Sequence, residues 1–214
     1  MQIIKTGDVE EKVAEILADK IHSLLEEKEY AIISVPGGRS AAAVFAELVR
    51  KDIDWERTHW FMVDERMVDI LDKESNFKVL KNNMPNEANL HPFLIDSGVG
   101  RYERELTEYQ DYFDIAILSV GEDGHVASLF PKHPSIGDDS EFFIVMDDSP
   151  KLPRERMSSS RLLIERSGTI VLLFKGESKR KAYEQFFDKK ISVEQCPAKL
   201  VNVAKEVYVV TDLG

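Results

Sequence analysis

The chain has 214 residues, of which 43% are hydrophobic and 31% charged, a composition that is usual for a protein with a packed core. Its formal net charge of −11 argues against a nucleic-acid-binding protein and against a protein adsorbed on anionic lipid, because both need a basic surface. Its single cysteine, Cys196, cannot form an internal disulfide, and we expect a buried thiol there. The sequence shows neither a signal-peptide pattern nor a run of about 18 apolar residues, so we expect a cytoplasmic, soluble protein without a membrane span.

The first half of the chain alternates helical and strand patterns. Apolar residues from Val9 to Leu25 recur with helical spacing, and Asp8 with Glu11 resembles a capping box at the start of that helix. A loop is expected to begin at the charged tripeptide 64–66. In chain order, the predicted elements are a helix over 8–25, a strand over 30–35, a helix that carries 42–49, a strand over 59–63 and a polar helix around 75–82.

The second half repeats this alternation. In chain order, the predicted elements are a short strand over 91–95, a helix over 101–110, a strand ending at 120, a weaker strand over 142–146, a loop over 147–160, a strand over 169–175, a helix over 177–187 and a strand over 206–211. Strands that alternate with helices imply βαβ units. No linker, low-complexity segment or internal repeat divides the chain. We therefore predict a single α/β domain over 1–214, with a Rossmann-like, mostly parallel sheet and helices on both faces.

The segment Tyr112–Pro131, YFDIAILSVGEDGHVASLFP, is the most informative stretch of the chain. Its apolar run up to Val120 is typical of a strand that is buried on both faces of a parallel sheet. Asp123 and His125 follow at once, within a glycine-flanked turn. Because ligands of open parallel sheets bind just beyond the carboxyl ends of the strands, a titratable pair at this point indicates chemistry.

Two roles are open for His125. It could cap or begin a following helix, or it could be a general base whose tautomer and basicity are set by Asp123. A metal site is not expected, because no other histidine or cysteine stands at ligand spacing.

Three further loops are expected at the same edge of the sheet. Pro36-Gly37-Gly38-Arg39-Ser40 links a strand to a helix, where backbone N–H groups can approach an anion, although such a glycine pair can equally be a tight turn. Arg66 follows Asp64 and Glu65, and its planar guanidinium suits a phosphate or a carboxylate, whereas the alternative is a solvated ion cluster. Arg156 and Lys179 would form a cationic pocket in a protein with 28 basic and 39 acidic residues.

In this order, the loops resemble those of the 6-phosphogluconolactonase family, within the glucosamine-6-phosphate deaminase and ribose-5-phosphate isomerase-like superfamily. The resemblance covers nearly the whole chain, and its most specific part is FDIAILSVGEDGHVASLFP. The other matching segments are VPGGRS, WFMVDERMV followed by ESNF, PRERMSSS, GESK and CPAKLV. Ser119, Ala41 and Asp69 depart from the usual family pattern, but none of them replaces a candidate acid, base or phosphate-binding residue.

The resemblance implies hydrolysis of 6-phosphoglucono-1,5-lactone to 6-phosphogluconate, without a cofactor and without a metal. In that reaction His125 would take a proton from water, Asp123 would orient the imidazole or bind the sugar, and Arg66 would face developing negative charge or the phosphate. The implied groups that bind the substrate and its phosphate are Gly37, Gly38, Arg39, Ser40, Arg156 and Lys179.

Two alternatives remain beside this reading. An amino-sugar-phosphate deaminase or isomerase of the same fold would want a further carboxylate soon after the histidine, and the segment 126–131 contains none. A non-enzymatic sugar-phosphate sensor would keep the cations without needing His125. The expected partner is a small phosphorylated sugar lactone rather than nucleic acid or a membrane, and the protein is expected to be a monomer or a small homo-oligomer.

Overall fold

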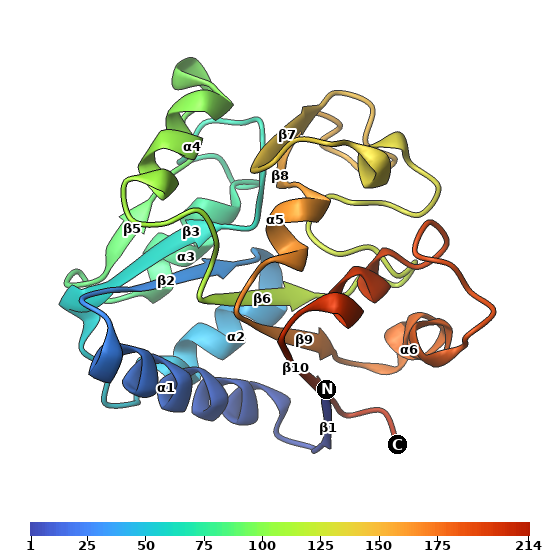
Figure 1. The fold of residues 1–214 in the computed structure, drawn as a ribbon, viewed down its shortest axis with the longest axis horizontal. Helices are drawn as coiled ribbons and strands as arrows, with labels where there is room; N and C mark the ends of the chain where they lie inside the picture. The colour runs from blue at the N-terminus through green and yellow to red at the C-terminus, as the bar shows by residue number, and fades with distance from the viewer.

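A seven-stranded sheet runs through the computed structural model, which describes all residues, 1–214 (Figure 1). In order across the sheet, the strands are β1 (Gln2–Lys5), β10 (Glu206–Thr211), β9 (Thr169–Phe174), β6 (Ile115–Ser119), β2 (Ala31–Val35), β3 (Thr58–Met62) and β5 (Asn89–His91). Every neighbouring pair is parallel. The predicted fold class, an α/β domain with a mostly parallel sheet, is confirmed.

The chain builds this sheet outward from its middle in two directions. From β2 it proceeds to β3 and β5 on one side, and from β6 it proceeds to β9 and β10 on the other. The strands β2 and β6 are therefore neighbours across a topological switch point. Helices that leave such a point on opposite sides leave a crevice between them, which is where parallel sheets hold ligands.

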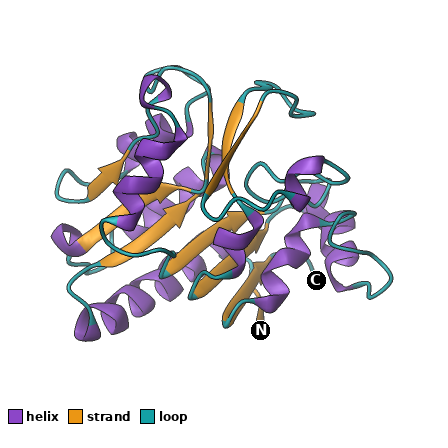
Figure 2. Cartoon of the chain, turned by 45° about the horizontal axis from the view of Figure 1, so that its top comes forward, coloured by secondary structure: helices purple, strands orange, loops and turns teal.

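Helices cover both faces of the sheet (Figures 1 and 2). The α-helices are α1 (Val9–Glu27), α2 (Gly38–Leu48), α3 (Asn76–Asn83), α4 (Val99–Thr107), α5 (Arg161–Glu165) and α6 (Arg180–Phe187). The 3-10 helices are η1 (Trp55–Arg57), η2 (Ile95–Ser97), η3 (Pro134–Gly137), η4 (Glu177–Lys179) and η5 (Pro197–Val203). None of these helices has the length and apolar character that crossing a membrane requires.

The core consists of two apolar layers, one on each face of the sheet, because alternate side chains of a strand point to opposite faces. In β9, Val171 and Leu173 pack in the layer that contains α1 and α2. Ile170, Leu172 and Phe174 pack in the layer that contains α5, α6 and η5. A strand that is buried on both faces reads as a continuous apolar run, which explains why β6 and β9 were recognisable in the sequence.

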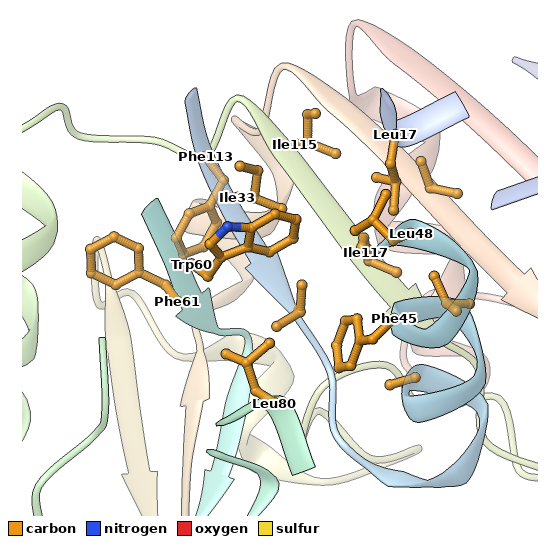
Figure 3. Close-up of a cluster of buried hydrophobic side chains, with 14 of the residues drawn as sticks. Leu17, Ile33, Phe45, Leu48, Trp60, Phe61, Leu80, Phe113, Ile115 and Ile117 are labelled. Atoms are coloured by element: carbon orange, nitrogen blue, oxygen red, sulfur yellow. The ribbon is translucent and has the colours of Figure 1, made fainter. Parts of the chain in front are cut away.

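Figure 3 shows part of the first layer, in which Leu17 of α1 and Phe45 and Leu48 of α2 lie beside Ile115 and Ile117 of β6. All five side chains are essentially inaccessible to solvent. Each buried side chain of this size contributes roughly 1.5–3 kcal/mol relative to an exposed one, so this layer supplies much of the energy that holds helices on the sheet.

A second, three-stranded antiparallel sheet was not predicted. It consists of β4 (Asp64–Arg66), β8 (Arg156–Ser159) and β7 (Phe143–Met146), with β8 in the centre. The tripeptide 64–66 and the segment 147–160 were expected to be loops, and this was wrong for β4 and β8. Both strands are short and polar, so neither shows an apolar alternation, and each depends on a partner that is distant in the sequence.

The start of the first helix also differs from the prediction. Asp8 stands at the N-cap of α1, but its side chain makes no capping hydrogen bond. Its N–H instead donates to Oγ1 of Thr6, at 3.1 Å. The sequence also failed to reveal β1, because four largely exposed residues form it and only its pairing with β10 holds it in the sheet.

A pair of histidines, the buried His59 and the half-buried His91, joins β3 to β5 at the edge of the large sheet. Nδ1 of His59 lies 2.9 Å from Nε2 of His91, and the two rings pack among Phe61 and Tyr109. Burial lowers the pKa of both histidines from 6.5 to about 4, and the charge of His91 adds to this effect at His59. The pKa of His91 is lowered even though Oε2 of Glu105, whose negative charge would favour a protonated ring, lies 3.7 Å from its Nδ1. Both side chains are therefore neutral in the native protein at neutral pH.

We expect this pair to make folding stability depend on pH. Between about pH 6.5 and pH 4 the unfolded chain binds protons at these histidines and the folded chain does not, so stability is lost as the pH falls through that window. One such histidine contributes roughly 2 kcal/mol of loss between pH 7 and pH 5. The measurement is the free energy of unfolding in urea as a function of pH.

The control for this prediction is a double variant, His59→Gln with His91→Gln, which retains polar side chains that do not titrate. It should lose much less stability on acidification than the wild type, whereas His22→Gln, at an exposed position of α1, should behave as the wild type does. An equal loss of stability in the double variant would show that other groups cause the acid sensitivity.

Candidate active site

The carboxyl ends of four neighbouring strands bring the predicted site loops to one edge of the sheet. Residues 36–38 follow β2, Asp64–Arg66 follows β3, residues 121–125 follow β6 and Gly176–Lys179 follows β9. These strands are direct neighbours in the order β9-β6-β2-β3, and all run the same way. The switch point between β6 and β2 therefore lies in the middle of this edge, between the two glycine turns.

The turn after β6 folds back so that Asp123 and His125 meet. Oδ1 of Asp123 lies 2.5 Å from Nδ1 of His125, and the Gly121 N–H donates to the carbonyl of His125 at 2.8 Å. A Cβ atom on Gly121 would lie only 1.9 Å from that same Nδ1. The glycine at this position is thus required because the imidazole occupies the space that any side chain would take.

The turn packs against the segment that begins at Cys196, with Gly124 in contact with Cys196. Gly124 has a φ of 88°, which favours glycine, and a Cβ atom there would lie 2.9 Å from Sγ of Cys196. The Ala198 N–H donates to the carbonyl of Gly124 at 2.9 Å, so η5 is tied to the turn. Cys196 is buried, as predicted, and burial raises the pKa of its thiol.

No helix follows His125, so the interpretation that this histidine caps or begins a helix is wrong. A tight turn follows instead, closed by an isolated antiparallel bridge between Val126 and Leu129, with Ala127 at a φ of 49°. The apolar residues after the histidine are buried in the second core layer. They fix the turn through packing rather than through helical hydrogen bonds.

The contacts of His125 determine its tautomer. A carboxylate oxygen only accepts hydrogen bonds, so an imidazole nitrogen 2.5 Å from Oδ1 of Asp123 must carry the hydrogen. In the neutral ring Nε2 is then an unprotonated acceptor, and no hydrogen bond within the protein involves it. The side chain is 19% exposed, so this nitrogen belongs to a group that solvent reaches.

Asp123 is kept ionised beside this histidine. Burial disfavours its charged form, but the hydrogen bonds and charges of His125 and Lys151 outweigh burial and hold the pKa of the Asp123 carboxyl well below its ordinary value. Lys151 joins the pair although no sequence pattern singled it out: its Nζ lies 3.2 Å from Oδ2 of Asp123 and 3.3 Å from Nδ1 of His125. The only signal in the sequence was its place in the segment 147–160, which is rich in proline, arginine and serine.

Arg66 and Arg156 stand directly opposite each other on β4 and β8. Like charges on directly opposite residues of paired strands repel each other, and an anion bound between them would reduce that repulsion. Arg156 is buried, and its donors face the carbonyls of Lys151, Leu152 and Pro153 at 3.4, 3.1 and 2.9 Å. Burial lowers the pKa of Arg156; Asp64 opposes this effect and Arg66 adds to it.

The side-chain hydrogen bonds of these two arginines are with groups of the protein itself. Nη1 of Arg66 donates to the carbonyl of Glu74 at 2.5 Å, and its Nε is buried without a hydrogen-bond partner. Nη1 of Arg156 lies 3.8 Å from Oδ2 of Asp64 and 3.4 Å from the hydroxyl of Ser128. Arg156 therefore braces the segment 151–153, in addition to any role toward a ligand.

The two carboxylates beside Arg66 have structural partners. Oε1 of Glu65 accepts the N–H of Asn76 at 2.7 Å and Oε2 accepts that of Phe77 at 2.7 Å, so Glu65 caps the start of α3. Burial raises the pKa of Glu65, although these backbone bonds oppose the shift. Oδ2 of Asp64 accepts the hydroxyl of Ser128 at 2.7 Å, which ties β4 to the turn after His125.

The glycine turn after β2 forms the beginning of α2, with Gly37 at the N-cap. A Cβ atom on Gly37 would lie 1.9 Å from Oδ1 of Asn76, so this glycine is needed for close packing against α3. Gly38 has a φ of 87° and is exposed, as is Arg39, while Ser40 is half-buried. The turn is therefore both a tight connection and an exposed helix N-terminus at the site.

Lys179 follows β9, whereas the glycine turn follows β2, and β6 with its Asp123–His125 turn lies between these two strands. Lys179 is half-buried in η4, and burial lowers the pKa of its ammonium; Glu122 and Asp123 oppose this shift, whereas Lys151 adds to it. The lysines 151 and 179 thus place two positive charges near one carboxylate. The structure holds no group of three or more His, Cys, Asp or Glu side chains arranged for a metal ion.

A cavity of about 950 Å³ lies away from this site. Thr169 and Glu206, which line it, are the first residues of β9 and β10, so it opens at the amino ends of the strands. Its walls carry none of the candidate residues. We place the functional site at the carboxyl edge, because the titratable pair, the cations and the topological switch point meet there.

Comparison with known proteins places the chain among relatives of one kind. Residues 5–210 match the sequence model of the family described as Glucosamine-6-phosphate isomerases/6-phosphogluconolactonase. The chain is 31% identical over 221 residues to a 6-phosphogluconolactonase of Borreliella burgdorferi, a match that covers 97% of this chain and 94% of the relative. It is 32% identical over 176 residues to a 6-phosphogluconolactonase of Thermotoga maritima, with 78% and 79% covered. The crystal structure of a Thermotoga maritima 6-phosphogluconolactonase aligns with a TM-score of 0.83 at 28% identity, over 98% of this chain and 97% of that one.

Gly121→Ala should separate His125 from Asp123, because the new Cβ needs the space that Nδ1 now occupies. In the wild type, nitrogen-15 NMR of the imidazole should show a hydrogen-bonded Nδ1–H, and in the variant that signal should be lost. Gly137→Ala is the matched control, since a Cβ there meets nothing within 4 Å. An unchanged Nδ1–H signal in Gly121→Ala would mean that the turn does not determine the contact.

Proposed function

The chain belongs to the family of glucosamine-6-phosphate isomerases and 6-phosphogluconolactonases, and we propose that it hydrolyses 6-phosphoglucono-1,5-lactone to 6-phosphogluconate. The observation that carries the proposal is the Asp123–His125 pair at the centre of the carboxyl edge, in which Nδ1 is bound to the carboxylate. That arrangement leaves Nε2 as the acceptor that a general base needs. The reaction needs no redox step, so no cofactor is proposed.

The proposed reaction has two proton transfers through one nitrogen. Nε2 of His125 takes a proton from water while the water oxygen attacks the lactone carbonyl carbon, and a tetrahedral oxyanion forms. When the adduct collapses, the bond to the ring oxygen breaks, and the imidazolium returns its proton to that oxygen. Asp123 stabilises the imidazolium between these steps and fixes the ring. Arg66 is proposed to face the oxyanion or the phosphate.

The phosphate is proposed to bind through Arg156, Lys179 and the turn 37–40. The protein has a net charge of −11, so attraction at long range disfavours a dianionic substrate and local cations must hold it. Two observations support the proposal: Arg66 and Arg156 are paired residues of β4 and β8, and the N-terminus of α2 is exposed. Gly37, Gly38, Arg39 and Ser40 would offer backbone or side-chain donors there.

The lactonase reaction is favoured over the isomerase reaction of the same family. Moving a proton between carbons calls for a further carboxylate near the histidine, and residues 126–131 contain none. The hydroxyl of Ser128, within that segment, is bound to Asp64. We also propose that residues 1–214 work as one sugar-phosphate lactonase domain in the cytoplasm, as a monomer or small homo-oligomer.

His125→Ala should lower lactone hydrolysis by about 10² to 10⁴-fold, which is the usual effect of removing a general base. The measurement is acid release from 6-phosphoglucono-1,5-lactone, corrected for spontaneous hydrolysis. His133→Ala is the control, because His133 also pairs with an aspartate, Asp148, at 3.0 Å, but lies outside the proposed site. Turnover close to that of the wild type in His125→Ala would contradict the proposed base.

Lys179→Gln should raise the KM for the phosphorylated lactone by about ten- to a hundredfold, because a charge-assisted contact contributes roughly 1.5–3 kcal/mol. Lys181→Gln, an exposed lysine two positions away, is the matched control and should have little effect. Gluconolactone without phosphate should react poorly with the wild type and be insensitive to Lys179→Gln. An equal loss of activity on both lactones would show that Lys179 does not bind the phosphate.

A further inference from the structure

We propose that Lys151 is a positioning residue for the general base: its ammonium holds the second oxygen of Asp123 and keeps the imidazole of His125 neutral until water is bound. The catalytic consequence of this role rests on the proposed function. The electrostatic role itself does not, because it concerns only groups that the protein brings together.

The geometry defines a three-residue cluster, Lys151–Asp123–His125. Oδ1 of Asp123 accepts from Nδ1 of His125 at 2.5 Å, and Oδ2 pairs with Nζ of Lys151 at 3.2 Å. Because each oxygen has its own partner, the carboxylate cannot rotate without losing one contact. Nζ of Lys151 also lies 3.3 Å from Nδ1 of His125. Since Nδ1 already donates to Asp123, this last contact is between a positive charge and an N–H, and it disfavours a positively charged ring.

The backbone at Lys151 is held on both sides. Its carbonyl accepts from the hydroxyl of Ser149 at 3.0 Å and from Nη2 of Arg156 at 3.4 Å, and its N–H donates to the Ser149 oxygen at 3.3 Å. Ser149 and Arg156 are both buried. The lysine side chain is 45% exposed, so a fixed backbone carries a charged group into the mouth of the site.

The charges around His125 oppose one another. Asp123 and Glu122 bring negative charge to the turn, and Glu122 and Asp123 both act on Lys179. Lys151 from the segment 147–155 and Lys179 from η4 bring positive charge to the same place, and burial raises the pKa of the Cys196 thiol below the turn, so this thiol carries no charge at neutral pH. Of these two cations, Lys151 is the one that contacts the imidazole, with its Nζ 3.3 Å from Nδ1.

This balance matters because a neighbouring carboxylate favours the protonated imidazole. A protonated imidazole cannot accept a proton from water, so an upward shift of its protonation midpoint lowers the fraction of active base at a given pH. With the positive charge of Lys151 nearby, the carboxylate of Asp123 can orient the ring while Nε2 stays unprotonated. Lys151 would thus separate the two effects of Asp123, which are ring orientation and increased basicity.

The test is the protonation midpoint of His125, measured by nitrogen-15 NMR and assigned by comparison with His125→Ala. Lys151→Gln should move the midpoint upward by about one pH unit, at the low end of the effect of a nearby charge because Lys151 is partly exposed. Lys151→Arg, which keeps the charge, should stay near the wild-type value. Arg154→Gln, which removes an equal charge from an exposed position in the same segment, is the matched control.

A midpoint in Lys151→Gln that equals the wild-type value or lies below it would overturn the inference. The acid limb of kcat/KM for the lactone should move upward by the same amount as the NMR midpoint. A merely structural role for Lys151 would lower activity at every pH and leave the limb in place. If the wild type did not hydrolyse the lactone at all, the proposed function would fail, while the NMR midpoint would still decide the role of Lys151.

Discussion

The site depends on one buried cation, the guanidinium of Arg156. A charge without partners is costly inside a protein, so the groups around it must supply oxygens, and here they come from three parts of the chain. The carbonyls of the segment 151–153, the hydroxyl of Ser128 and the carboxylate of Asp64 all turn toward it. One side chain thereby joins the small sheet, the turn after β6 and the segment that carries Lys151.

This joining gives an anionic protein a locally cationic edge. The segments that converge on Arg156 also bring Arg66 and Lys151 to the carboxyl ends of β3 and β6, where Lys179 approaches from η4. The carboxylates there are already engaged: Glu65 caps α3, and Asp123 lies between His125 and Lys151. Arg66, Arg156 and Lys151 also have partners within the protein, whereas the half-buried Lys179 forms no ion pair, and its charge would be free to meet the proposed phosphate.

The central strands of the large sheet were predictable from the sequence, as was β7, whereas β4 and β8 of the small sheet were not, and burial explains the difference. The strands β6 and β9 are buried on both faces, so hydrophobic residues alone specify them, and the glycines and the Asp-x-His spacing mark the turn that follows β6. The strands β4 and β8 have three and four residues, charged or polar ones among them, and exist only because they pair across 90 residues of chain. Lys151 could not be predicted as a site residue because its position depends on hydrogen bonds from its backbone to the side chains of Ser149 and Arg156. No local sequence pattern reveals such bonds.

The two sheets contribute different parts of the chemistry, and this limits how the site can work. The proposed base belongs to the large sheet, on a turn fixed by glycines that admit no side chain, whereas the arginines belong to the small sheet. A substrate whose phosphate is held by Arg156 and whose carbonyl meets the proposed base would contact both sheets. Its affinity for the cations then helps to place the lactone carbonyl near Nε2, so binding energy from a remote phosphate would appear in turnover as well as in KM. The phosphate-free lactone lacks that bridge, and the same base would meet a carbonyl that is poorly placed.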